Sequence, residues 1–275
     1  MITQAQIKSW LPDTISSFTA KYPVSVPSIR IASRMCAEKV RDQAYIDVGL
    51  SNPSSPRSLT AAGETIHGPK GSIIVIYQAN CPVVHDDFER FLWHELGHTF
   101  VFSEEADDFF PKYCFGHPEN RISIGYLFWE EFVAEALAYS IRGEEVYLDV
   151  THPLIWPKIY ITLQGLLEAG ISGDYRSLAY FFATSLMDKK SSQFLAITER
   201  MRLQEPLESV ESSSEGIRPI EVNADITHLD SIYALLQSQL ENSKWWLVNE
   251  RFLSKLGRRL KQITISSSTC RHTAE

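Results

Sequence analysis

The run His94-Glu95-Leu96-Gly97-His98 has residue types and spacing suited to metal-assisted hydrolysis. Residues four apart lie on the same face of an α-helix, so the imidazoles of His94 and His98 can reach one ion. Zinc accepts neutral histidine nitrogen, and Glu95 directly follows the first ligand, where it can take a proton from a water acidified by the metal. The run therefore predicts a catalytic site with one Zn²⁺ per chain and Glu95 as the general base.

A catalytic zinc site needs a third protein ligand, and Glu131 is the favoured candidate. The segment around it, 128–139, is so apolar that carboxylates there are costly unless a cation compensates them. Glu135 lies one helical turn further on, so one of the two could bind metal while the other orients a histidine. Glu130 takes the ligand role if the helix is rotated by one residue. The alternative is that all three carboxylates lie on a solvated helix face.

His117 is the alternative third ligand, and Glu104 and Glu105 are further candidates. A histidine on a loop after the first helix resembles the SprT/Spartan group of DNA-repair proteases. The acidic balance of this chain and its lack of a basic cleft disfavour that group. The metzincin pattern fails, because it needs glycine and histidine where this chain has Val101 and Glu104.

The run 94–98 and the later Glu131-x-x-Ala134-Glu135 resemble the gluzincin metallopeptidases, in which a downstream helix gives a glutamate ligand. More narrowly, the chain is similar to the ImmA/IrrE group, with a G-x-I-x-[VI] strand, R-F-x-x-A-H-E-L-G-H and E-x-x-A-N-x-F-A. The matching positions are Gly71, Ile73, Val75, Arg90-Phe91, the run 94–98 and the segment 131–138. Trp93, Glu135 and Leu137 depart from that pattern, and the likeness covers about residues 70–140. The resemblance implies a zinc peptidase and, for ImmA/IrrE, the cleavage of regulatory proteins.

Peptide hydrolysis also needs a hydrogen-bond donor for the oxyanion that forms at the scissile carbonyl. Tyr139, His152 and His228 are candidates, although a single histidine or tyrosine more often has a structural role. The β-branched run 72–77 is predicted either as an edge strand, along which an extended peptide adds, or as a core strand.

Hydrophobic periodicity predicts the elements that must position these residues. Strands are predicted at 28–31, 44–50 and 72–77, with a long surface loop at 51–71. Helices are predicted at about 85–102, 123–142, 154–169, 174–188, 191–204, 225–241 and 244–263. We expect an α+β fold in which a small twisted mixed sheet packs on the two metal-binding helices. The expected division is a zincin-like metallopeptidase core over 1–145, a mostly helical C-terminal subdomain over 146–265 and a disordered tail over 266–275.

Composition limits the function classes. The 275 residues are 44% apolar and 22% charged, as in ordinary soluble globular proteins. A net charge of −8 argues against nucleic acid as the main partner. No apolar stretch is long enough for a membrane span, and the start of the sequence does not have the pattern of a secretory signal. The four cysteines, Cys36, Cys81, Cys114 and Cys270, are widely spaced, so free thiols and a cytoplasmic location are expected.

The expected function is hydrolysis of peptide bonds in a peptide or protein substrate by a zinc metallopeptidase. Two alternatives remain: a non-catalytic zincin-like module used for binding or regulation, and a zinc hydrolase of a non-protein substrate. The intact Glu95 favours catalysis, because a purely structural zinc site has no need of that carboxylate.

Overall fold

The computed structural model describes residues 2–51, 61–105, 120–140, 174–187 and 227–271. It confirms the α+β fold. A three-stranded sheet has the order β1-β3-β2, with β1 (Ser28–Ala32) parallel and β2 (Gly63–Gly68) antiparallel to β3 (Gly71–Tyr77). Because β3 is central, the edge-strand prediction for 72–77 is wrong. Among the described strands, β2 lies at one edge of the sheet, next to β3.

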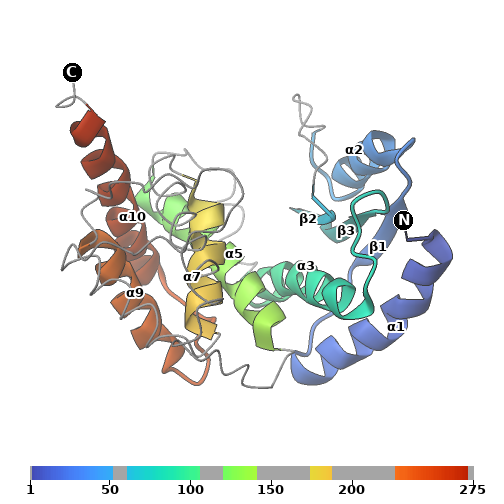
Figure 1. Ribbon diagram of the computed structural model, residues 1–275, viewed down its shortest axis with the longest axis horizontal. Helices are drawn as coiled ribbons and strands as arrows, with labels where there is room; N and C mark the ends of the chain where they lie inside the picture. Colours follow the sequence, from blue (N-terminus) through green and yellow to red (C-terminus); the bar gives the residue numbers. More distant parts are fainter. Residues whose placement is uncertain (1, 52–60, 106–119, 141–173, 188–226, 272–275) are drawn as a thin grey trace, which may run out of the picture.

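The two faces of the sheet carry different helices (Figure 1). Ile74 and Ile76 point into the larger core, which contains α1 (Gln4–Lys21) and α3 (His85–Glu105). Ile73 and Val75 point into a smaller core with α2 (Ala37–Asp47). This alternation is what a strand buried on both faces requires, since successive side chains point to opposite sides.

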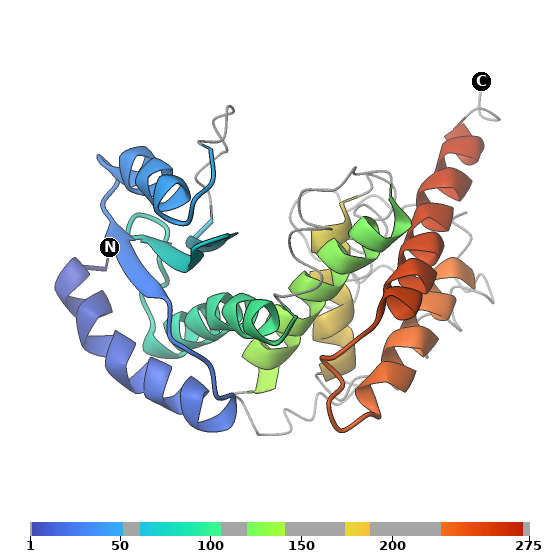
Figure 2. The same ribbon diagram turned by 180° about the vertical axis from the view of Figure 1, so that it is seen from behind.

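α5 (Arg121–Tyr139) connects the sheet-containing part to the C-terminal helices (Figures 1 and 2). It packs against α3 on one side and against α7 (Tyr175–Met187) and α10 (Glu250–Arg271) on the other. α9 (Thr227–Leu240) packs against α10. Nearly every side chain of α5 from Phe128 to Ala138 is therefore buried, which explains its almost uniformly apolar sequence.

Two further predictions for the first 80 residues are wrong, and one helix was not predicted. The segment 44–50 is not a strand, because α2 continues to Asp47; Ala37, Arg41 and Ala44 are buried at helical spacing. The predicted loop 51–71 contains β2, whose short polar sequence is paired by β3. The helix α1, which contains Pro12, was not predicted. A capping box of Thr3 and Gln6 begins this helix.

The later helices lie close to their predicted positions. α3 extends to Glu105, α5 covers 121–139, and α7 and α9 differ from the prediction by at most two residues at each end. α10 begins at Glu250 and continues to Arg271, through part of the expected tail. The predicted helices at 154–169 and 191–204 lie outside the described residues.

Two further observations bear on the expected location. No helix within the described ranges is long and apolar enough to cross a membrane. Cys36 and Cys81 carry free thiols, Cys114 lies outside the described residues, and the side chain of Cys270 is not described.

Candidate metal centre

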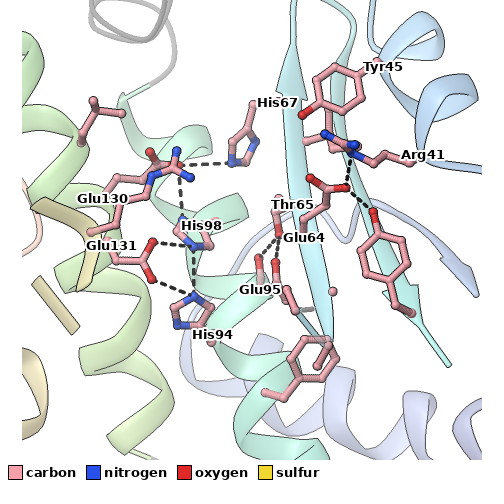
Figure 3. A pocket seen from close by; sticks show the side chains of 18 of the residues that line it. Arg41, Tyr45, Glu64, Thr65, His67, His94, Glu95, His98, Glu130 and Glu131 are labelled. Atoms are coloured by element: carbon pink, nitrogen blue, oxygen red, sulfur yellow. Dashed lines mark hydrogen bonds and ion pairs between the residues drawn. The ribbon is translucent and has the colours of Figure 1, made fainter. Parts of the chain in front are cut away.

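The structure brings His94, His98 and Glu131 together between two helices (Figure 3). The histidines lie one turn apart on α3, and Glu131 points at them from α5. The helices can approach closely because position 97 has no side chain. A side-chain carbon on Gly97 would lie 2.8 Å from the Cα atom of Ala134.

The three side chains are spaced as metal ligands. His94 Nε2 lies 3.1 Å from His98 Nε2 and 3.3 Å from Glu131 Oε1. His98 Nε2 lies 3.7 Å from Glu131 Oε2. Bonds of about 2.0–2.1 Å in a tetrahedral shell place neighbouring ligand atoms about 3.3 Å apart. Glu131 contributes a different oxygen atom to each of its two distances, and all three values lie near this spacing, so the group is compatible with one metal ion such as zinc.

Glu135 holds the first histidine from the other side. Its Oε2 lies 2.9 Å from His94 Nδ1, so the two carboxylates of α5 contact opposite nitrogens of one imidazole. Arg90 donates a hydrogen bond to Glu135 and lies over the ring of Tyr139, 4.3 Å from its centroid. The buried carboxylate is thereby neutralised, and the rotation of the His94 ring is restricted.

Glu130 has the corresponding position at the second histidine. Its Oε1 lies 3.2 Å from His98 Nδ1 and 3.6 Å from His67 Nε2. His67, on β2, is stacked on Phe102 and hydrogen-bonded through Nδ1 to the hydroxyl of Ser72, at 2.7 Å. Glu130 thus contacts the side of His98 that faces away from Glu131. The alternative in which the three glutamates lie on a solvated face is wrong.

Glu95 lies beside the triangle and is 6% exposed. Its Oε2 accepts a hydrogen bond of 2.6 Å from the hydroxyl of Thr65 on β2. The edge strand therefore fixes the orientation of the carboxylate that follows the first histidine.

The electrostatics of the site follow from burial and opposite charge. Burial would lower the pKa of His94, but Glu131, Glu135 and Glu95 outweigh it, and this pKa lies well above its ordinary value. Burial would raise the pKa of Glu131, but His94 and His98 lower it to about 2. The pKa of Glu130 is lowered in the same way, by His98 and His67 against burial. Burial lowers the pKa of His67 to about 4, so this imidazole is neutral at pH 7.

A cavity of about 500 Å³ extends from the triangle around β2 to the other face of the sheet. Its metal end is lined by Glu95, Glu130, Glu131 and the exposed Arg176 of α7. Its far end is lined by Arg41 and Tyr45 of α2. The site is therefore open to a ligand much larger than a single water molecule.

One further candidate from the sequence is described by the structure, and five are not. Tyr139 packs under Arg90 and does not line the cavity. His117 and His152 lie outside the described residues, and the side chains of Glu104, Glu105 and His228 are not described.

The structure also adds residues that the sequence did not identify: Thr65, His67, Arg90, Arg41 and Arg176. Arg90 was noted only as part of a family resemblance. His67 and Thr65 fall in the segment predicted to be a loop, so the missed strand concealed both. A second signal for Arg90 is that the carboxylates of so apolar a helix need cationic partners.

No protein-family model, curated protein or solved structure matches this chain. The interpretation of the site therefore rests on its residues and their geometry.

Proposed function

We propose that the protein is a zinc-dependent metallopeptidase of the gluzincin type, in which His94, His98 and Glu131 hold the metal and Glu95 is the general base. The observation that carries the proposal is the triangle of ligand atoms beside a buried carboxylate that is not one of its corners. A structural zinc site is closed by four protein ligands, whereas the described residues supply a group of three, which would leave a position for substrate.

Each residue has a defined task in the proposed reaction. When bound, zinc would act as a Lewis acid toward the scissile carbonyl and acidify the attacking water. Glu95, held by Thr65, accepts the proton of that water and passes it to the leaving amine. Glu135 accepts a hydrogen bond from Nδ1 of His94 and so keeps that imidazole in the tautomer that presents Nε2 to the metal, while the carboxylate of Glu130 lies 3.2 Å from Nδ1 of His98.

The edge strand β2 supports a peptide as substrate. The main-chain hydrogen bond from Tyr77 to Ala62 sets the antiparallel register, so the main-chain groups of Gly63, Thr65 and His67 point away from β3. An extended peptide can pair with such an edge, and Thr65 places that edge next to Glu95.

The proposal is tested with a library of peptides and unfolded protein substrates, incubated with the zinc-loaded protein and followed by mass spectrometry. Cleavage by the wild type that disappears in Glu95→Gln and after treatment with a metal chelator supports the proposal. If zinc is bound and no peptide bond is cleaved, the protein is either a binding module or a hydrolase of another substrate. Small ester and amide substrates, tested in parallel, distinguish these two outcomes.

A further inference from the structure

We propose that the far end of the cavity, formed by Arg41 and Tyr45, is a subsite that binds a carboxylate of the substrate. The inference rests on the proposed peptidase function and adds a substrate class to it: peptides that carry a negative charge close to the scissile bond.

Arg41 is an unusual residue for a helix that packs on a sheet. It is 3% exposed, and its guanidinium lies 5.5 Å from the centre of the Tyr45 ring. Its Nε lies 2.9 Å from Glu64 Oε1 on β2 (Figure 3). Burial would lower the pKa of Arg41, but Glu64 together with a hydrogen bond to Tyr45 and the nearby Tyr77 outweighs it, so the pKa is raised and the guanidinium is charged.

The hydrogen-bonding capacity of this guanidinium is not used up. Nη2 is buried and has no hydrogen-bond partner among the described residues. Glu64, in contrast, also accepts a hydrogen bond from the hydroxyl of Tyr77. A buried donor without an acceptor is costly, particularly on a charged group. Among the described residues, the unpaired group at this end of the cavity is therefore a hydrogen-bond donor. An anionic ligand, which supplies an acceptor, is favoured over a cationic one.

The far end lies within reach of a substrate bound at the metal. Glu64 and Thr65 are consecutive residues of β2; Thr65 contacts Glu95 on one face of the sheet, and Glu64 contacts Arg41 on the other. The cavity is lined by residues on both faces of the sheet and by Ala62 and Gly63, which directly precede Glu64. In a peptide paired with the edge of β2, successive side chains also alternate between the two faces. A side chain next to the scissile bond therefore points toward Arg41.

Arginine binds carboxylates through its planar fork, and the neighbouring tyrosine adds a hydroxyl. The carboxylate can belong to an acidic side chain or to the C-terminus of a short peptide. Both sources have the same chemistry, and peptides that differ in only one of them separate the two.

A purely structural role is the main competing explanation, since Arg41 also connects α2 to the sheet. Arg30 offers a matched control, because it connects β1 to the same helix through Asp47 and does not line the cavity. Arg41→Met and Arg30→Gln each remove one ion pair between α2 and the sheet, and only the first alters the subsite.

The test measures binding to the full-length, zinc-supplemented Glu95→Gln protein by fluorescence anisotropy. Four labelled peptides are compared, with Glu or Gln at the varied position and with a free or amidated C-terminus. We expect about tenfold tighter binding of one carboxylate form over its amide partner, as for a charge-assisted hydrogen bond. Adding Arg41→Met should bring this ratio to about one, whereas adding Arg30→Gln should leave it unchanged.

A second variant covers the case in which Arg41→Met does not fold. Glu64→Gln frees Arg41 from its competing carboxylate, so the preference for the charged peptide should increase above that of the parent protein. A purely structural ion pair would not produce this increase. A ratio near one in the parent protein, a ratio that persists without Arg41, or the absence of any binding would overturn the inference.

The same peptides are incubated with wild-type protein to separate the two proposals. Cleavage without preference for the charged peptides leaves the peptidase function standing and rejects the subsite. Selective binding without cleavage supports the subsite and counts against the peptidase function.

Discussion

The Cα atom of Ala134 on α5 lies 2.8 Å from the point that a side-chain carbon on Gly97 would occupy. Gly97 lies between His94 and His98 on α3, and Ala134 lies between Glu131 and Glu135 on α5. This contact sets the separation of the helices, and so the spacing of the candidate ligand atoms of His94, His98 and Glu131.

Gly97→Ala should therefore destabilise the protein. Alanine stabilises an exposed helical position relative to glycine by about 0.5–1 kcal/mol, so a purely local effect would raise the free energy of unfolding. The overpacking against Ala134 should instead lower it by about 1–3 kcal/mol and weaken metal binding. Urea unfolding measures whether the free energy of unfolding rises or falls in Gly97→Ala. A rise would show that the helices are not in contact here.

Replacing either supporting carboxylate should weaken metal binding. Glu135→Gln and Glu130→Gln leave the three ligands in place and remove the partner of one Nδ1 atom. We expect a loss of about 10–100-fold in zinc affinity for each, measured by competition with a chromophoric chelator. Asp47→Asn, which changes an exposed carboxylate paired with Arg30, is the control and should bind zinc as the wild type does. Wild-type affinity in both buried variants would contradict the assigned contacts.

Thr65 should act through Glu95. Thr65→Val removes the hydroxyl that donates to this carboxylate and keeps the shape of the side chain. The turnover number should fall by about tenfold, the order expected for a misdirected general base, while zinc content stays the same. Thr65→Ser restores the hydroxyl and should recover most of the activity. Equal losses in the valine and serine variants would point to packing as the role of Thr65.

The metal-free protein should lose stability in acid through Glu131. Its pKa falls from an ordinary 4.5 to about 2 on folding, so the folded state binds the proton less readily than the unfolded state. The resulting stabilisation is complete above about pH 4.5 and is lost as the pH falls toward 2. Urea unfolding of metal-free wild type and Glu131→Gln should therefore show a difference that shrinks over this interval. A difference independent of pH would contradict the ion pairs of Glu131.

The sequence predicted the α+β class, most of the later helices and the grouping of His94, His98 and Glu131. These predictions succeeded because His94 and His98 have a spacing with few other uses, and because carboxylates in so apolar a helix need compensation. The errors lie where local preference is overridden by tertiary contacts. β2 contains few strand-forming residues and is paired by β3, and Tyr45 and Ile46 suggested a strand in what is the helix α2. The subsite around Arg41 depends on both elements, so it was not predictable from the sequence.

In the proposed site, His94, His98 and Glu131 hold one zinc ion per chain. Elemental analysis of the purified protein tests it, on wild type beside His98→Ala, Glu131→Ala, His117→Ala and Glu95→Gln. We expect about one zinc per chain in the wild type, loss of zinc in His98→Ala and Glu131→Ala, and retention in His117→Ala and Glu95→Gln. A wild-type protein that contains no zinc and takes none up, or a site emptied by His117→Ala and not by Glu131→Ala, would contradict it.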